Sequence, residues 1–434
     1  MNVADDAGDA GGLHLFTHTL ECSSFLLLTR SLRVPLCCLE RMQRAAAVAL
    51  ASLAMSAAVS ACADDVDCTL NGVCTGGACV CDSGWAGPAC AALKLGITDP
   101  ALGHPWGAPG SSWGGLPVYD PVGGDWHLFY SQMARGCGLG AWSTNSRVVH
   151  AVSSNPLGPF TDVDVVQPAF SHNAQAFRTA DGVWVVWHIG CSQGERVVNC
   201  SASAADALPL APRTVPPGAP GSNPDALCAP QPFGALGETY MTYSWAPSPQ
   251  GPWTPLGRPA LEGSLDRSTW WPWLTNPAPW LLPDGSLLLG VSGDGGASRK
   301  CIGFARAPTW NGSFTLEGAA EAAAPIPGGE DPFVWVNARG HRHAIWHDVS
   351  GRSNGGHAFA HVASPTAWTV VTHELYNGTI VFPNGTLAVA SDRERPKLLF
   401  DGSTGAPLAL FNGMVPPSVT GDGACFTAVT HIGA

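Results

Sequence analysis

The chain has 434 residues, of which 45% are hydrophobic and only 12% charged, with 52 glycines, 37 prolines and 17 tryptophans. Glycine and proline are frequent, but less so than in disordered or collagen-like chains, and the tryptophans indicate a packed core or an aromatic-lined surface. A formal net charge of −12, without a basic cluster, disfavours nucleic-acid binding. Long amphipathic helices are scarce and turn residues recur every few positions, so we expect one small module and one large all-β domain.

The N-terminal region has the composition of a leader. Residues 1–41 show no periodic element, and we interpret them as an extension of the gene model or a long leader. From Met42, an arginine precedes a short apolar run and a small-residue cleavage site, the pattern of a signal peptide at 42–61. The run is too short to span a membrane, so we expect a secreted, extracellular protein with no transmembrane span. A lipobox at 59–62 is the alternative.

Cysteine usage agrees with secretion. Twelve of the 15 cysteines follow residue 61, an even number, as expected where disulfides persist. Four Asn-x-Ser/Thr sequons are compatible with a glycoprotein: Asn199, Asn311, Asn377 and Asn384. Sequence leaves open the pairing of the later six cysteines, Cys137, Cys191, Cys200, Cys228, Cys301 and Cys425. A Cys200–Cys228 bridge is our guess.

Six cysteines lie close together at residues 62–90, separated by 5, 5, 4, 1 and 8 residues. So short a stretch cannot bury enough apolar surface to fold alone, which predicts that disulfides hold it. Cysteine spacing alone does not fix their pairing. A zinc site is disfavoured because no histidine lies within the segment.

The runs 67–74 and 79–90 closely resemble an EGF-like domain, which we place at 62–92. The resemblance implies the disulfides Cys62–Cys74, Cys68–Cys79 and Cys81–Cys90. Such a module usually serves as a spacer or as a protein contact.

The rest of the chain repeats itself. A Ser/Pro turn followed by an aromatic residue ends at Phe160, Trp253, Trp310 and Trp368, with steps of 93, 57 and 58. The longer step indicates an insertion at about 190–235. Repeated units of short strands and tight turns predict a five-bladed β-propeller over 95–434, with the segment near 95–115 completing the last blade. An irregular β-sandwich is the alternative.

Polar residues recur at the start of each unit, before proline or a small residue. These dipeptides are Asp120-Pro121, Asn173-Ala174, Asn276-Pro277, Asp331-Pro332 and Arg395-Pro396, flanked in three units by His172, Glu330 and Glu394. Because a propeller's innermost strands line one funnel, we expect these side chains to converge there.

At this point residues 110–415 resemble glycoside hydrolases of the family 43 and family 32 type. The likeness is carried by the blade-start Asp-Pro, the closure at 153–161 and the run Asp331-Pro332-Phe333-Val334. It implies hydrolysis of an extracellular polysaccharide, with Asp120 as base, Glu330 as acid and Asp331 adjusting the pKa of that acid. Asn173 and Asn276 stand where further carboxylates are expected. A non-catalytic glycan-binding propeller is therefore one alternative, and adhesion through the EGF-like module is another.

Further residues are assigned to substrate binding. His188 and His347 end similar strands and could hold substrate, exchange protons or bind a metal, while Glu394 and Arg395 could clamp substrate as an ion pair. Trp271, in a tryptophan-rich stretch, could stack on a sugar. With His172, Asn173 and Asn276, these residues complete the expected site. No dense metal-ligand spacing is visible, so no cofactor is expected, although a structural metal in the funnel stays open.

Each assignment has a structural alternative. Asp120 could be a turn residue bonded to its own backbone, and Glu330 with Asp331 could merely link blades. The histidines could be satisfied structural groups, and the tryptophans could be core.

Overall fold

The computed structural model describes residues 62–106, 111–190, 198–200, 208–212, 241–254, 257, 259–262, 274–295, 299–317, 326–349, 354–417 and 424–433. The expected leader and signal peptide, with Cys191, Cys228 and Trp271, lie outside these residues. Within them, no helix is long and apolar enough to cross a membrane.

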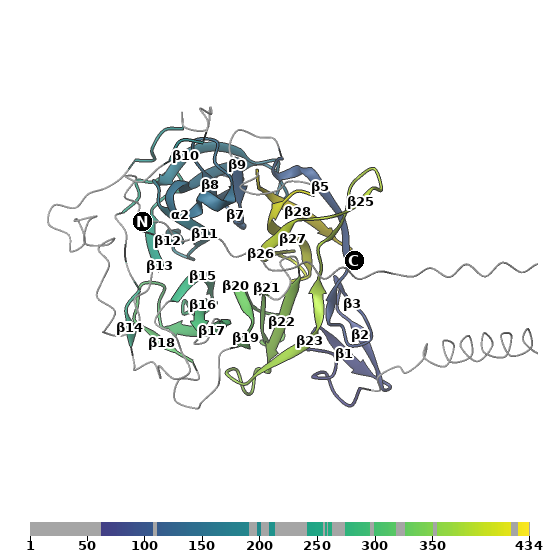
Figure 1. Ribbon diagram of the computed structural model, residues 1–434. Helices are drawn as coiled ribbons and strands as arrows, with labels where there is room; N and C mark the ends of the chain where they lie inside the picture. Colours follow the sequence, from purple (N-terminus) through teal and green to yellow (C-terminus); the bar gives the residue numbers. More distant parts are fainter. Residues whose placement is uncertain are drawn as a thin grey trace, which may run out of the picture. The chain divides into compact units, whose positions relative to one another are not determined.

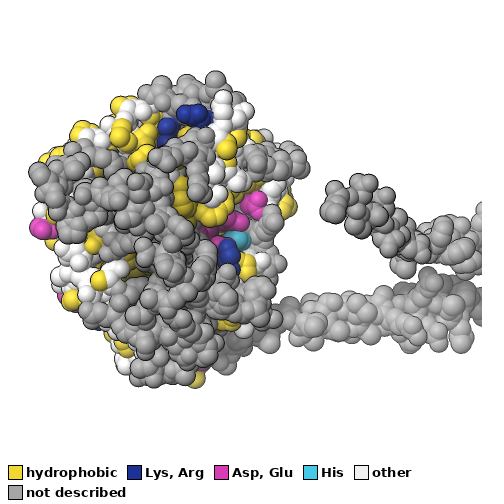
Figure 2. Space-filling view, turned by 60° about the vertical axis from the view of Figure 1, so that its left-hand side comes forward, with side chains coloured by type: hydrophobic (Ala, Val, Ile, Leu, Met, Phe, Trp, Pro, Cys, Tyr) yellow, Lys and Arg dark blue, Asp and Glu magenta, His cyan; other side chains and the backbone are white. Residues whose placement is uncertain are grey.

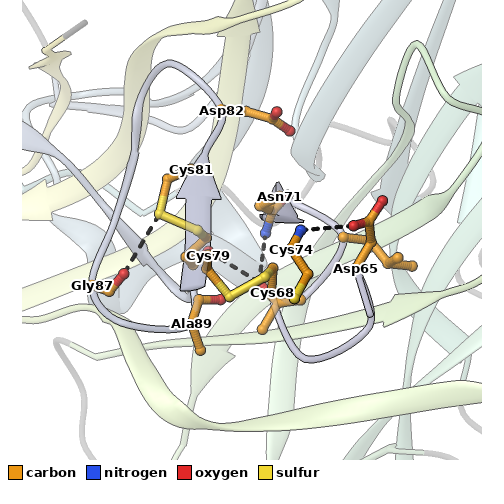
Figure 3. Close-up of a disulfide and its surroundings, with 12 residues drawn as sticks. Asp65, Cys68, Asn71, Cys74, Cys79, Cys81, Asp82, Gly87 and Ala89 are labelled. Atoms are coloured by element: carbon orange, nitrogen blue, oxygen red, sulfur yellow. Dashed lines mark hydrogen bonds between the residues drawn. A yellow bond between two sulfur atoms is a disulfide. The ribbon is translucent and has the colours of Figure 1, made fainter. Parts of the chain in front are cut away.

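The N-terminal module has the predicted disulfides. Its strands are β1 (Gly72–Thr75), β2 (Ala78–Cys81), β3 (Trp85–Ala86) and β4 (Ala92–Leu93), paired as two small antiparallel ribbons. The disulfides are Cys62–Cys74, Cys68–Cys79 and Cys81–Cys90, which confirms all three pairs. Asp65 accepts a hydrogen bond from the Cys74 backbone, beside this cluster (Figure 3).

Five further sheets follow. Sheet I holds β6 (Ser111–Trp113), β7 (Pro117–Tyr119), β8 (Trp126–Met133), β9 (Ser146–Ser153) and β10 (Thr161–Gln167). Sheet II holds β11 (Ser171–Arg178), β12 (Trp184–Gly190) and β13 (Met241–Ala246). Sheet III holds β14 (Leu261–Glu262), β15 (Leu274–Leu281), β16 (Leu287–Gly295), β17 (Arg299–Ala307), β18 (Phe314–Leu316) and β19 (Ile326–Pro327). Sheet IV holds β20 (Gly329–Val336), β21 (Arg342–Asp348), β22 (Gly355–Ala360) and β23 (Trp368–Tyr376).

Sheet V closes the ring. It holds β26 (Asp392–Phe400), β27 (Pro407–Val415), β28 (Phe426–Ile432), β5 (Leu95–His104), β24 (Thr379–Val381) and β25 (Leu387–Val389). Strand β5, from the start of the domain, pairs antiparallel with β28 from its end. Of the segment near 95–115 that was expected to complete the last blade, residues 95–104 do so, whereas Ser111–Trp113 form β6 of the first blade.

Successive sheets touch one another around a common centre. Contacts join β7 and β8 of sheet I to β11, β11 to β15, β15 to β20 and β20 to β26, and the innermost strand β6 of sheet I contacts β27 and β28 of sheet V. The described residues thus form a five-bladed β-propeller, as predicted, and not a β-sandwich (Figure 1). Because neighbouring blades cover both faces of a sheet, central strands such as β12 are buried along their whole length.

The repeated aromatic residues lie where the third strand of a blade passes to the fourth. Phe160 precedes β10 and Trp368 begins β23, while Trp253 follows β13 and Trp310 follows β17. The side chains of Phe160 and Trp253 are buried, so these two repeated aromatic residues belong to the hydrophobic core.

The guessed Cys200–Cys228 bridge is wrong, because Cys200 pairs with Cys137. The neighbouring Asn145 amide explains the proximity. Its Nδ2 donates to the Val198 carbonyl at 2.7 Å and its Oδ1 accepts from the Val198 N–H at 3.1 Å, which holds the two segments together.

The EGF-like module packs against sheets IV and V. Trp85 is buried and stacks on Trp335 with a ring-centroid distance of 6.4 Å, within one cluster that also holds Phe333 and Leu410. Arg339 donates to Asp82 of the module at 2.6 Å. The module and the propeller therefore share part of their core.

This shared core yields a stability prediction. Trp85→Ala should lower the free energy of unfolding of the whole propeller by about 3–5 kcal/mol, the usual cost of truncating a buried tryptophan. Val80→Ala, at a site 59% exposed in the same module, should change it by less than about 0.5 kcal/mol. Urea unfolding followed by tryptophan fluorescence measures both. An unchanged propeller transition in Trp85→Ala would show that the module is an independent spacer.

Candidate functional site

The first strand of each blade carries a bulge at which the backbone turns left-handed. Registers shift within β11, β15, β20 and β26. The residues at these shifts are Asn173, Asn276, Asp331 and Arg395, with φ angles of 63°, 51°, 56° and 53°. This region costs non-glycine residues energy, and such outliers cluster at functional sites. The sequence therefore placed these four positions correctly at equivalent points of their blades.

In the first blade, the equivalent residue is Gly114. The inner strand is interrupted there, between Trp113, which pairs with Ser131, and Pro117, which pairs with Leu128. The intervening segment has one residue more than its partner strand, as at the other bulges, and Gly114 has a φ of 66°.

Asp120 is not part of this set. In every blade the left-handed residue lies eleven or twelve positions before the first residue of the second strand. The pairs of left-handed residue and strand start are 173 and 184, 276 and 287, 331 and 342, 395 and 407, and 114 and 126. Asp120 precedes β8 by only six. Its Oδ1 accepts from the Val122 N–H at 3.0 Å and its Oδ2 from the Gly123 N–H at 3.1 Å, so it stabilises a turn. Counting spacing back from the second strand would have found Gly114.

A pocket of about 530 Å³ opens above these bulges. The residue preceding each left-handed position lines it, namely Trp113, His172, Thr275, Glu330 and Glu394. Asn173, Asn276 and Asp331 also line it, one step deeper in each strand. Figure 2 shows acidic, basic and histidine side chains gathered in a hollow beside hydrophobic ones. The predicted convergence of blade-start residues is thus observed for all but the first blade.

Arg395 joins the blades beneath the pocket. Its guanidinium donates to Asp331 Oδ1 at 2.7 Å and to the Asn173 carbonyl at 3.3 Å. Asn173 Nδ2 in turn donates to Asn276 Oδ1 at 2.6 Å. A Cβ added to Gly114 would lie 3.0 Å from Arg395 Nε, so the arginine occupies the space of a side chain in the first blade.

The two carboxylates of the fourth blade are each paired with a cation. Asp331 pairs with the buried Arg395, and Glu330 pairs with Lys300, which lies on β17 of the preceding blade. Burial and the nearby Asp331 raise the pKa of Glu330, against the effect of Lys300. The four side chains of these two ion pairs therefore have a formal net charge of zero.

Glu394 is the remaining carboxyl group. Burial, reinforced by Asp331 and Glu330, raises its pKa to about 9, and burial lowers the pKa of His347. Near neutral pH both groups are therefore uncharged, although Glu394 Oε1 lies 3.7 Å from His347 Nε2. Burial, with a smaller effect of Arg395, also lowers the pKa of His172, so the pocket carries no net charge from its histidines.

Three of these residues could hold a cation. One ligand atom each from Asp331, His347 and Glu394 lies within 4.8 Å of the others, and neither ring nitrogen of His347 has a hydrogen-bond partner. Carboxylate oxygens and a neutral imidazole together suit a divalent metal, which would have to displace the proton that Glu394 holds near neutral pH. The structural metal left open by the sequence thus has a suitable donor set.

Three neighbouring rings, those of Trp142, Phe170 and His172, form an aromatic wall of the pocket. Trp142, in the short helix α2 (Trp142–Asn145) after the 3-10 turn η2 (Leu139–Ala141), is 40% exposed and lines the pocket. Its ring centroid lies 5.3 Å from that of His172 and 5.8 Å from that of Phe170. The Cys137–Cys200 disulfide and the Asn145 amide brace this wall.

Sequence reasoning missed several pocket residues and misplaced Asp120 and His188, while His347 lies beside Glu394 without lining the pocket. Trp142 comes from the short helix α2, Phe170 immediately precedes β11, and Lys300 lies on the third strand of its blade, all outside the repeated dipeptides. His188 is fully buried, lies 3.1 Å from the Thr242 hydroxyl and does not line the pocket, so it is a structural histidine of the blade interior.

Comparisons with known proteins identify one module by sequence. Residues 65–92 match the Teneurin-like EGF domain family. No curated protein sequence matches the chain.

Solved structures with similar coordinates include the catalytic domain of a GH62 α-L-arabinofuranosidase from Coprinopsis cinerea, at 13% identity, covering 78% of this chain and 96% of that one, with a TM-score of 0.46. An α-L-arabinofuranosidase from Podospora anserina, in complex with cellotriose, has 11% identity, covers 79% and 99%, and has a TM-score of 0.46. An endo-arabinase from Bacteroides thetaiotaomicron has 13% identity, covers 75% and 95%, and has a TM-score of 0.42. The propeller fold of this chain is established by its own sheets.

The buried ion pair gives a second prediction. Arg395→Met should lower the free energy of unfolding by about 3–5 kcal/mol, because it leaves Asp331 buried without a countercharge. Adding Asp331→Asn should recover part of this loss. Lys300→Met, in the more exposed pair, should cost less than about 1 kcal/mol. Chemical denaturation of all three variants measures these effects, and equal losses for Arg395→Met and Lys300→Met would contradict the central role of Arg395.

The raised pKa of Glu394 predicts that the free energy of unfolding depends on pH. Its folded pKa of about 9 exceeds the ordinary value of 4.5, so the native state binds this proton more tightly than the unfolded state. The contribution to stability is full below pH 4.5 and is lost as pH rises to about 9. The stability of the parent relative to Glu394→Gln should therefore fall across this range in urea titrations. Parallel pH profiles would contradict the assignment.

Proposed function

We propose that the chain is an extracellular protein whose propeller pocket binds a neutral sugar residue of an oligosaccharide or polysaccharide. Extracellular location is supported by the disulfide-bonded EGF-like module, since such disulfides persist in oxidising compartments. Sugar binding is supported by the lining of the pocket.

The observation that carries the proposal is that Trp142 lines the same pocket as the polar side chains of Glu330, Glu394 and Asn276. Flat indole faces stack on the C–H faces of sugar rings, and Trp142 presents an exposed ring to the pocket. The pocket also contains polar side chains, because Glu330, Glu394 and Asn276 offer hydrogen-bond acceptors and donors for hydroxyl groups. One apolar face and several polar groups in one cavity match the amphipathic surface of a sugar.

The charges favour a neutral ligand. Glu330 with Lys300 and Asp331 with Arg395 form compensated pairs, and Glu394 is protonated near neutral pH. Among the described residues that line it, the pocket therefore offers no uncompensated cation to a sugar carboxylate, sulfate or phosphate.

The distribution of carboxyl groups favours binding over inverting hydrolysis. Such hydrolysis needs two carboxyl groups about 6.5–9.5 Å apart on opposite sides of the bond. Among the described pocket residues, carboxyl groups come only from the fourth and fifth blades, whereas at the inner strands the first three blades supply Trp113, His172, Asn173, Thr275 and Asn276. No described residue of the pocket stands as a base opposite the acids.

Glycosidic hydrolysis is the second candidate, and one observation favours it. Glu394 is protonated near neutral pH and lies within 4.8 Å of Asp331, measured between ligand atoms. An acid beside a carboxylate, separated by about 5–5.5 Å, is the arrangement of retaining glycosidases. In this reading Glu394 protonates the leaving oxygen and Asp331 is the nucleophile.

Titration calorimetry with neutral arabinan, xylan, galactan and fructan oligosaccharides tests binding. The parent should bind at least one of them, and Trp142→Ala should weaken binding about tenfold, or ~1.4 kcal/mol. Trp106→Ala is the matched control, since Trp106 is 44% exposed and does not line the pocket. Equal affinities for parent and Trp142→Ala, or no binding to any neutral glycan, would contradict the proposal.

Product release from the same oligosaccharides separates the two candidates. Binding without release is expected. Release by the parent that is lost in Glu394→Gln, with affinity retained, would instead establish the second candidate, and Glu330→Gln tests the acid expected from the family resemblance.

A further inference from the structure

A second feature lies away from the pocket, on the outer edge of sheet V. The hairpin of β24 and β25 extends this sheet beyond β5, with the strand order β25-β24-β5 (Figure 1). Val381 pairs with Leu387 on one side and with Ile97 on the other, so the three side chains form a row across three strands. Leu387 and Val389 are 67% and 64% exposed, and Ile97 is 43% exposed.

An apolar edge strand of this kind is a hazard. Strand β25 ends the sheet, and the unpaired backbone of an edge strand can pair with another chain. Natural proteins usually protect such edges by keeping the strand short, or with charged residues, proline or a covering segment. Strand β25 is short, but its three residues, Leu387, Ala388 and Val389, include no charge and no proline, and two of them are exposed apolar side chains.

Two sequons bracket the same hairpin. Asn377-Gly378-Thr379 leads into β24, and Asn384-Gly385-Thr386 forms the turn to β25. Both asparagines are exposed. Each uses its Oδ1 to accept the backbone N–H of the threonine two residues on, at 3.0 Å. The Nδ2 atom, which carries the sugar in a glycoprotein, takes no part in these turn bonds.

We infer that Asn377 and Asn384 carry asparagine-linked oligosaccharides that cover the edge formed by Leu387 and Val389. The modification transfers an oligosaccharide from a lipid diphosphate donor to the asparagine. A bond forms between Nδ2 and the first sugar carbon, that carbon's bond to the donor oxygen breaks, and Nδ2 loses a proton as the lipid diphosphate leaves. The bulky, hydrated glycans at both ends of β24 keep a second chain from pairing with β25.

Site occupancy is the first test. The full chain is secreted from a eukaryotic cell line, deglycosylated by an amidase in ¹⁸O-labelled water, and its peptides are analysed by mass spectrometry. Asn377 and Asn384 should both convert to labelled aspartate, and Asn377→Gln with Asn384→Gln should lose both glycan masses. Either asparagine unmodified in the secreted protein overturns the inference.

Shielding is the second test, made on folded protein so that failed folding cannot mimic the result. Enzymatic removal of the glycans should shift the protein from monomer to larger species in light scattering. Leu387→Thr with Val389→Thr should keep the deglycosylated protein monomeric. Asn311→Gln, which removes a sequon outside the hairpin, should leave the parent monomeric. Unchanged association after deglycosylation, or no rescue by the threonine variant, overturns the shielding role.

Discussion

The arrangement of the site depends on one buried arginine. Arg395 comes from the fifth blade, pairs with Asp331 of the fourth, donates to the Asn173 backbone of the second and occupies the space beside Gly114 of the first. The third blade is reached through the bond from Asn173 to Asn276. Because a buried cation needs a countercharge and hydrogen-bond acceptors, this residue constrains all five positions at once.

That constraint has consequences for chemistry. With Arg395 beneath the first blade, the equivalent position of that blade holds glycine, and asparagines complete the floor. The remaining acids are paired with Arg395 and Lys300 or, like Glu394, protonated near neutral pH. The result is a polar, electrically balanced floor beneath an aromatic wall, which suits recognition of a neutral sugar better than attack on its linkage.

The sequence predicted the elements that rest on local or repeated signals. Cysteine spacing with the EGF-like resemblance predicted three disulfides, and the repeated turns predicted five blades closed by the segment near residue 95. Failures arose where pairing across the sheet decides the outcome. Asp120-Pro121 has the same composition as a blade start but lies in a turn, and the distance to the second strand of the blade, rather than the dipeptide, identifies Gly114. Trp142 and Lys300 reach the pocket from a braced loop and a neighbouring blade, and Cys200 meets Cys137 through tertiary packing, none of which a repeat in the sequence encodes.

The most direct test of the central claim is a crystal structure of the protein with a bound neutral oligosaccharide. We expect one sugar ring stacked on Trp142, with hydroxyl groups within hydrogen-bond distance of Glu330, Asn276 or Glu394, and an intact glycosidic bond. A sugar bound elsewhere on the molecule, or a cleaved glycan covalently attached to Asp331, would contradict it.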